Sequence, residues 1–251
     1  MTARFPQETG GMSAGTRPSP VQERGERTIM MAEKRSCLII TGGTLDLAFA
    51  RSFLERGSFA KVIAVDGGLE AADALGIVPD YIVGDFDTAE RAVLEKYRQM
   101  PFIVWEQHKP EKNETDTELA RNRALTLGCE RIVFLGATGG RLDHLLGNLH
   151  VLYGCLERGI EAWLVDRQNR AYLVDTGKTF RREELWGKYV SFLPYTEEVK
   201  GITLTGFRYP LNKKDIRQGV EVGLCISNEL AEEEARLEFD EGILLCVESR
   251  D

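Results

Sequence analysis

The sequence predicts an α/β fold: a doubly wound, mainly parallel sheet in an N-terminal domain, followed by a small antiparallel β-sandwich domain. Between Ser36 and about residue 166, short apolar runs alternate with stretches of helical period, which is typical of a parallel sheet covered by helices. After residue 166 the helical periods stop, and short β-like runs follow one another with turn residues between them, as in sandwiches and barrels. A length of 251 residues allows one or two domains.

Each element is predicted from its own pattern. The apolar run Cys37–Ile40 ends at the turn Gly42–Gly43, and the helix after it, 45–56, carries apolar residues at helical spacing. Thr115, followed three residues later by Glu118, forms a capping box that begins a later helix. Further strands are expected at 61–65, 81–83, 102–105, 131–135 and 162–165, and further helices over 69–75 and from residues 89 and 142. In the second domain, strands are expected at 171–174, 189–193, 201–204, 220–226, 235–239 and 243–247.

Residues 1–35 differ from the rest of the chain. They are rich in Gly, Pro, Ser, Thr and Arg and have no sustained apolar period, so we expect a disordered arm. Met30 and Met31 stand just before the first strand-like run, which favours an over-long start assignment over a targeting peptide. The domains are therefore expected at 36–166 and 167–251.

Composition excludes some classes of function. Forty acidic and thirty-two basic residues give a net charge of −8, which argues against bulk binding of nucleic acid or of an anionic membrane, since both require basic patches. No apolar run reaches the roughly 18 residues that a membrane span needs. Five cysteines, none in a CxxC pair, lie in or beside apolar runs and are expected to be buried thiols. We expect a cytoplasmic protein.

The segment Gly84–Thr88 places two carboxylates, Asp85 and Asp87, where a strand ends. Side chains at i and i+2 face one way while the chain is extended, and two close carboxylates repel each other. A hard cation such as Mg²⁺, bound together with nucleotide phosphates, would compensate them. The alternative is a plain Asp turn in which Asp87 or Thr88 caps the next helix.

The segment Lys112–Glu118 has Asp116 in the first turn of the expected helix. Capping alone explains Thr115 and Glu118, but it does not explain Lys112 beside a positive helix end, which favours an anion site. Asp116 could complete a metal site with the carboxylates at the end of the earlier strand.

The segment Gly136–His144 follows a strand and precedes a helix, so its glycines leave backbone amides free for a phosphate while Arg141 adds a charged fork. It is neither a P-loop nor a GxGxxG motif. Asp143 either complements the helix dipole or acts in the site, and His144 is expected to pack or cap. Asn148 lies along the same margin of this helix as Arg141.

Together these segments resemble the thiamine pyrophosphokinase (thiamine diphosphokinase) family, bacterial type. Its members are similar at DGG, GDFDS, KDxTDxE, GGRxDHxLxN, a KYPL-like stretch and a C-terminal SNE, over roughly residues 37–248 and in the same order. The matching segments are Asp66–Gly68, Gly84–Thr88, Lys112–Glu118, Gly139–Asn148, Gly206–Leu211 and Ser227–Glu229. Without the resemblance, Ser227–Glu229 would be predicted only as a turn.

The resemblance implies an enzyme that transfers the diphosphoryl group of ATP to the hydroxyl of thiamine, giving thiamine diphosphate and AMP. It implies a homodimer with the active site between subunits, a nucleotide-binding catalytic domain over 36–166, and a thiamine-binding and dimerisation domain over 167–251. Mg²⁺ would be held by Asp85, Asp87 and Asp116. Asp143 would orient or deprotonate the hydroxyl, and Arg141 and Thr115 would bind phosphates. The nucleotide side would include Asp66, Gly67, Gly68, Lys112 and Asn148, and thiamine would touch Ser227 and Asn228.

Two departures from the family pattern stand near the expected metal. Thr88 replaces a serine and keeps the hydroxyl, whereas Asn113 replaces an aspartate and removes a charge. Two other functions stay open: a diphosphokinase of the same architecture acting on a hydroxymethylpterin, and a thiamine- or nucleotide-binding protein without turnover. The retention of the four aspartates at 85, 87, 116 and 143 argues against lost turnover.

Overall fold

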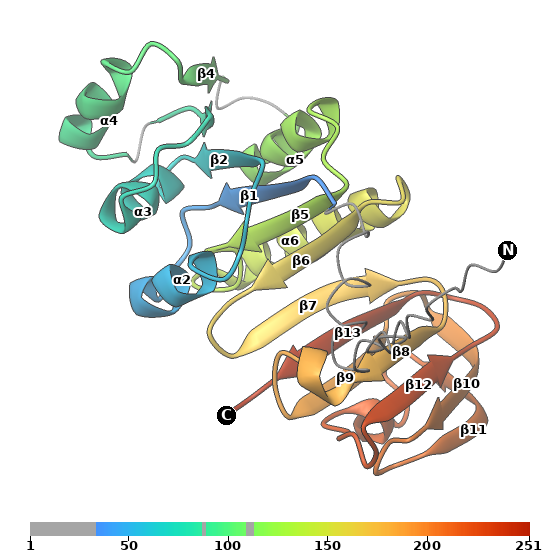
Figure 1. Ribbon diagram of the computed structural model, residues 1–251. Helices are drawn as coiled ribbons and strands as arrows, with labels where there is room; N and C mark the ends of the chain where they lie inside the picture. The colour runs from blue at the N-terminus through green and yellow to red at the C-terminus, as the bar shows by residue number, and fades with distance from the viewer. Residues whose placement is uncertain (1–33, 87–88, 109–112) are drawn as a thin grey trace, which may run out of the picture. The chain divides into compact units, whose positions relative to one another are not determined.

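A computed structural model describes residues 34–86, 89–108 and 113–251 (Figure 1). The expected arm over residues 1–35, except its last two residues, lies outside the described residues, and so do Asp87 and Lys112. The predictions made for them therefore stay predictions. Residues 34–251 belong to one compact unit.

Parallel strands form the first part of the larger sheet, in the order β4-β3-β2-β1-β5-β6. The chain winds outward from β1 to β4 and then returns to the other side of β1 for β5 and β6, so its direction reverses between β1 and β5. The predicted doubly wound parallel sheet is confirmed. Its strands are β1 (Ser36–Ile40), β2 (Lys61–Val65), β3 (Tyr81–Gly84), β4 (Val104–Gln107), β5 (Arg131–Leu135) and β6 (Glu161–Val165).

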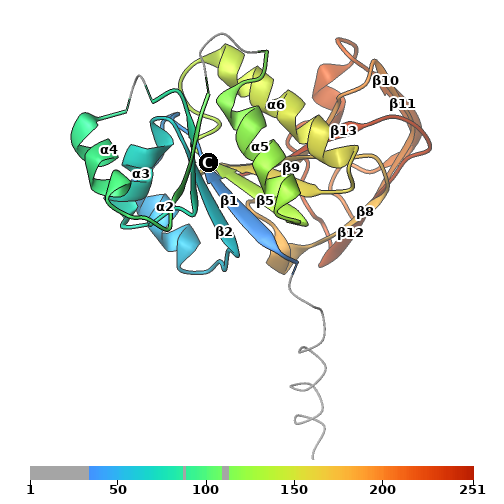
Figure 2. The ribbon, with the colours of Figure 1, turned by 90° about the horizontal axis from the view of Figure 1, so that it is seen from above.

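Helices cover both faces of this sheet (Figure 2). α2 (Leu47–Leu54) and α3 (Gly68–Leu75) pack on the face that carries Leu38 and Ile40 of β1. α5 (Asp116–Thr126) and α6 (Leu142–Leu156) pack on the opposite face, which carries Cys37 and Ile39. Since side chains of a strand alternate between faces, the run of buried residues in β1 reflects burial on both sides. α4 (Arg91–Arg98) packs beside β3 and β4 at the sheet edge.

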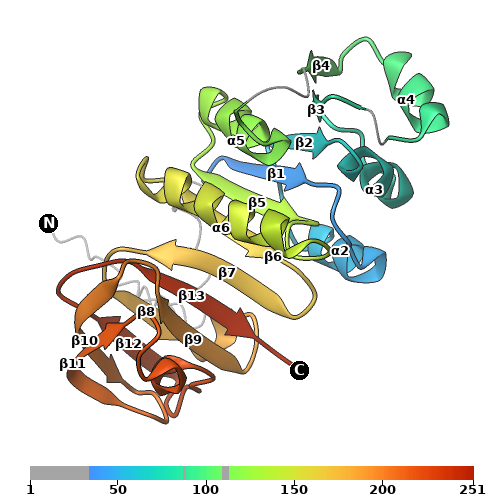
Figure 3. The ribbon, with the colours of Figure 1, turned by 180° about the vertical axis from the view of Figure 1, so that it is seen from behind.

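The sheet continues in antiparallel form through β7, β13 and β9, and a second, separate sheet has the order β11-β10-β12-β8 (Figure 3). The two antiparallel parts enclose a core that includes an edge-to-face cluster of Phe180, Phe192 and Phe207. The predicted antiparallel sandwich is therefore present, and one of its sheets extends the parallel sheet. Its elements are β7 (Asn169–Val174), β8 (Lys178–Arg181), η1 (Arg182–Glu184), β9 (Tyr189–Pro194), β10 (Glu198–Thr205), β11 (Leu211–Arg217), η2 (Val222–Cys225), β12 (Glu234–Glu238) and β13 (Leu244–Ser249).

Three parts of the second half differ from the sequence-based expectation. The strand expected at 220–226 is the short 3-10 helix η2, because Glu221 just before it has a left-handed backbone (φ 48°) that interrupts an extended chain. Strands β8 and β11 were not predicted, because each has a single buried residue, Phe180 or Ile216, and an edge strand needs no continuous apolar run. The division of the chain into domains at residue 166 stays a prediction.

The five cysteines all lie within the described residues and are free and buried, as predicted. Within the described ranges, the helices are too short or too polar to cross a membrane.

Candidate active site

The site is expected where the winding direction reverses, at the carboxyl ends of the parallel strands, because ligands of such sheets bind in the crevice formed there. The loops after β1, β2, β3, β4 and β5 all begin at this edge. The candidate residues in the first half of the chain lie on these loops or on the helices that follow them.

The backbones of the loops after β1 and β5 pack directly against each other. A Cβ on Gly43 would overlap the carbonyl oxygen of Gly136 and would lie 2.9 Å from that of Gly139, so only glycine allows this approach. The sequence predicts Gly42–Gly43 only as a turn. Paired glycines after several strands of one sheet are the signal that could have placed this loop in the site.

Asp66 lies near two other carboxylates at this edge. Asp66 follows β2, Asp85 follows β3 and Asp116 begins α5. Burial, followed by the charge of Asp116 and a hydrogen bond with it, raises the pKa of Asp66 to about 7, and Asp85 adds to the rise. The structure therefore brings together the candidates Asp66, Asp85 and Asp116 as one acidic cluster.

The beginning of α5 presents Asp116 to this cluster. Thr115 caps the helix, since its Oγ1 accepts a hydrogen bond from the backbone N–H of Glu118 at 3.2 Å. This half of the predicted capping box is confirmed. The carboxylate of Glu118 pairs with the buried Arg121 at 3.1 Å.

Gly67 and Gly68 form the start of α3 directly after Asp66. Gly67 is the residue before the helix, and the backbone N–H of Leu69 bonds to the carbonyl of Asp66 at 3.0 Å. The amino end of this helix therefore lies beside the acidic cluster, in the place expected for the nucleotide side.

Arg141 and Asp143, at the beginning of α6, form a two-point ion pair. The Nε of Arg141 donates to Oδ1 of Asp143 at 3.1 Å, and its Nη2 donates to Oδ2. Both side chains are exposed. The Arg141 guanidinium lowers the pKa of Asp143, and the backbone N–H of His144 has the same effect, so Asp143 is an ionised acceptor.

Asn148 of α6 supports the loop after β5. Its side chain is buried, and its Nδ2 donates to the carbonyl of Ala137 at 2.8 Å. This hydrogen bond fixes the glycine-rich loop to α6. The predicted contact of Asn148 with a nucleotide stays a prediction.

Replacing Asn148 by alanine is expected to leave the Ala137 carbonyl without its partner. A buried unpaired polar group costs about 1–3 kcal/mol, which corresponds to a lower melting temperature, and the loosened loop should weaken binding of the expected nucleotide. Thermal melting and nucleotide-binding measurements on the variant check this, with Asn169→Ala as the control outside the loop. Unchanged nucleotide binding together with a lower melting temperature would contradict the link between Asn148 and the nucleotide.

Ser227 and Asn228 lie in the antiparallel half, where two sequence segments form one unit. The side chain of Asn228 is 1% exposed; its Nδ2 donates to the carbonyl of Tyr209 at 2.8 Å, and its Oδ1 accepts from the N–H of Tyr209 at 3.0 Å. Ser227 is exposed, with a left-handed backbone (φ 55°), and its N–H bonds to Ser191 Oγ at 3.0 Å. The Gly206–Leu211 and Ser227–Glu229 segments are thus held together by Asn228.

Comparison with known proteins matches both halves of the chain. The family "Thiamin pyrophosphokinase, catalytic domain" matches residues 56–164, and "Thiamin pyrophosphokinase, vitamin B1 binding domain" matches residues 178–244. The thiamine pyrophosphokinase of Bacillus subtilis is 37% identical over 192 residues, which are 75% of this chain and 87% of the relative. Thiamine pyrophosphokinase 1 of Arabidopsis thaliana is 30% identical over 189 residues, 70% of this chain and 68% of the relative.

Solved structures agree with this comparison. The crystal structure of the Bacillus subtilis thiamine pyrophosphokinase has a TM-score of 0.77 at 32% identity, covering 86% of this chain and 99% of that chain. The structure from Geobacillus thermodenitrificans has a TM-score of 0.75 at 32% identity, covering 86% and 98%. With both domains matched and a well-covered relative more than 30% identical, the chain belongs to the thiamine pyrophosphokinase family.

Proposed function

We propose that this protein transfers the diphosphoryl group of ATP to the hydroxyl of thiamine, releasing AMP and forming thiamine diphosphate. The observation that carries the proposal is the acidic cluster of Asp66, Asp85 and Asp116 at the nucleotide-binding edge of the sheet, in a chain that also has the vitamin B1 binding domain of its family. Diphosphoryl transfer depends on positioning and charge neutralisation more than on covalent catalysis, so carboxylates, a metal ion and an arginine suffice.

Mg²⁺ fits the acidic cluster. Burial and then the charges of Asp116 and Asp85 raise the pKa of Asp66, so a cation would be favoured there, and carboxylate oxygens are ligands that Mg²⁺ prefers. Within the described residues, however, no group of three His, Cys, Asp or Glu side chains could hold an ion by itself. We assign Asp85 and Asp116 as ligands together with Asp87 and the phosphates of ATP. The ion would neutralise charge that develops on the phosphates.

The remaining residues of the first half would bind and orient the substrates. Arg141 would donate to a phosphate, and Thr115 would act there with the amino end of α5. Asp143, kept ionised by Arg141, would accept the hydrogen bond of the thiamine hydroxyl and orient its oxygen toward ATP. Gly67, Gly68 and Lys112 would line the nucleotide side, and the exposed Ser227 would touch thiamine. Asn228 would contribute by holding the thiamine side in shape, since its amide is already bonded to Tyr209.

We further propose a homodimer. Apolar side chains are exposed along α6 and on the segment before Ser227, with Leu146 and Val222 each 58% exposed. Tyr195 links the two groups, because its hydroxyl bonds to His150 of α6 at 2.8 Å and its carbonyl accepts from Gln218 at 2.9 Å. An exposed apolar surface of this kind is typical of an interaction site, and a second copy of the chain would cover both groups.

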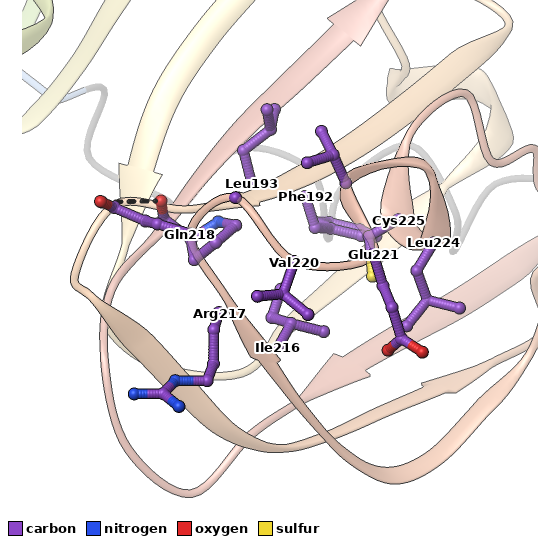
Figure 4. A pocket seen from close by; sticks show the side chains of 12 residues that line it. Phe192, Leu193, Ile216, Arg217, Gln218, Val220, Glu221, Leu224 and Cys225 are labelled. Carbon is purple, nitrogen blue, oxygen red and sulfur yellow. Dashed lines mark hydrogen bonds between the residues drawn. The ribbon is translucent and has the colours of Figure 1, made fainter.

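A pocket of about 160 Å³ lies beside the exposed apolar residues that precede Ser227 (Figure 4). It is lined by residues of β9 and of the segment from Ile216 to Cys225, including the apolar side chains of Val220 and Leu224. It would receive an apolar side chain of the second copy.

Replacing Leu146 by glutamate is expected to convert a dimer into monomers and to abolish AMP release, because a charge would be buried in the interface. Multi-angle light scattering gives the mass in solution. Val78→Glu, at an exposed valine remote in sequence from both groups, is the matched control and should stay dimeric. A Leu146→Glu variant that remains dimeric and active would overturn the proposed interface.

The function is tested by AMP release from ATP and Mg²⁺ with thiamine or with a hydroxymethylpterin. Thiamine-dependent release is expected, and release with the pterin alone would establish the other alcohol as substrate. Binding of thiamine and ATP without release would indicate a protein that does not turn over. We place the reaction in the cytoplasm, a compartment that keeps thiols reduced, which is consistent with five free cysteines among the described residues.

A further inference from the structure

We propose that Asp66 is a positioning residue that shapes the loop after β3 through its backbone amides and so aims Asp85 at Asp116. This assigns Asp66 a role different from lining the nucleotide side. The kinetic part of its test rests on the proposed function; the structural part does not.

The position of Asp66 is set by strand pairing. Its backbone N–H donates to the carbonyl of Val83 at 3.1 Å, which continues the pairing of β2 with β3 by one step. Its backbone is left-handed (φ 45°), an unusual conformation for a residue with a side chain. The chain thereby turns into α3 while the carboxylate stays over the end of β3.

The carboxylate holds the loop by its N–H groups. Oδ1 of Asp66 accepts from the N–H of Asp85 at 3.2 Å, and the N–H of Phe86 also bonds to the carboxylate. Two amides bound by one carboxylate fix the direction of the peptide between them. That peptide carries the side chain of Asp85.

Gly84 is matched to Asp66. A Cβ on Gly84 would overlap Oδ1 of Asp66, and its backbone (φ 150°) is one that other residues rarely adopt. The carboxylate therefore occupies the space that a side chain at position 84 would need. The glycine of one motif and the aspartate of the other are explained together.

Phe86 anchors the far side of the same loop. Its backbone is left-handed (φ 64°), and its buried ring packs edge-on against Trp105 of β4, with ring centroids 5.2 Å apart. Asp85 thus lies between two fixed points, the carboxylate of Asp66 and the ring of Phe86. Its direction depends on both.

The test separates hydrogen bonding from charge. In Asp66→Asn, the side-chain oxygen can still accept from both amides but carries no negative charge. In Asp66→Ala, both bonds are lost. A positioning role predicts that Asp66→Ala lowers kcat by about 10–100-fold, as loss of a supporting group beside a metal site does, with Asp66→Asn retaining most of kcat. The KM for thiamine should change little in either variant.

A structural readout does not depend on turnover. Hydrogen exchange followed by mass spectrometry reports on the peptide that contains Asp85 and Phe86. Its amides should exchange faster in Asp66→Ala and stay protected in Asp66→Asn. Asp80→Ala is the matched control. Asp80 directly precedes β3, at the opposite end of that strand from Asp85, and its carboxylate accepts a hydrogen bond from the N–H of Val62 at 2.8 Å. This variant should therefore lose stability while keeping kcat.

Two results would overturn the proposal. If Asp66→Asn is as inactive as Asp66→Ala while the peptide stays protected, Asp66 acts by its charge as a direct ligand. If Asp66→Ala leaves exchange of this peptide unchanged, the amides do not depend on it. Absence of thiamine-dependent AMP release from the wild type would refute the proposed function, and the exchange experiment would still decide the role of Asp66.

Discussion

Replacing Asp85 by asparagine is expected to lower AMP release by about 10²–10³-fold, which is what loss of one electrostatic group in an active site costs. Asparagine has the shape of aspartate but removes a charge that we assign to metal binding. The fold should persist, because Asp85 lies on a loop and contributes to the repulsion that raises the pKa of Asp66. The melting temperature should therefore be unchanged or slightly higher, while the Mg²⁺ concentration for half-maximal rate increases.

Asp73→Asn is the matched control for this experiment. Asp73 is an aspartate of α3, and its ion pair with Lys96 connects two helices away from the acidic cluster. This variant should keep its rate and its Mg²⁺ dependence. Asp85→Asn with wild-type AMP release would remove Asp85 from the proposed metal site.

The parallel half of the fold was predictable because its strands are buried on both faces. β1, β2 and β5 are therefore continuous apolar runs, and the helices between them carry a helical period. β8 and β11 lie at the edges of the smaller sheet and have only one buried residue each, so no apolar pattern marks them. The order of strands determines what is buried, and that order is not visible locally.

The same limit applies to the site. That Asp85 and Asp116 both lie near Asp66 follows from the carboxyl ends of parallel strands meeting at one edge. Two hydrogen bonds each join residues 19 positions apart in the sequence: one from the N–H of Asp85 to Asp66, the other from the N–H of Tyr209 to Asn228. Such residues meet only because strands pair, which cannot be predicted from the local sequence. Residue type alone cannot distinguish a side chain that holds a backbone from one that touches a ligand, because both roles use the same oxygen and nitrogen atoms.

An ion pair between β7 and β13, in the antiparallel part of the larger sheet, reaches the parallel part through Trp163 of β6. Glu248 of β13 is 1% exposed; it accepts from Arg170 Nη2 at 2.6 Å, from the Tyr172 hydroxyl at 2.7 Å and from the N–H of Trp186 at 2.8 Å. The Arg170 guanidinium lies over the rings of Trp163 in β6 and Trp186. This network fixes the place where parallel pairing gives way to antiparallel pairing.

Glu248→Ala is therefore expected to destabilise the protein by about 3–5 kcal/mol, because it leaves Arg170, whose side chain is only 19% exposed, without its counter-charge. For a chain of this size the melting temperature should fall by roughly 6–20 °C, at about 2–4 °C for each kcal/mol. Glu241→Ala, which removes an exposed ion pair with Lys200, should change the stability little. Calorimetry of both variants checks the difference. If Glu248→Ala melts within about 2 °C of the wild type, the network does not stabilise the junction, since a loss below roughly 1 kcal/mol is what a surface pair contributes.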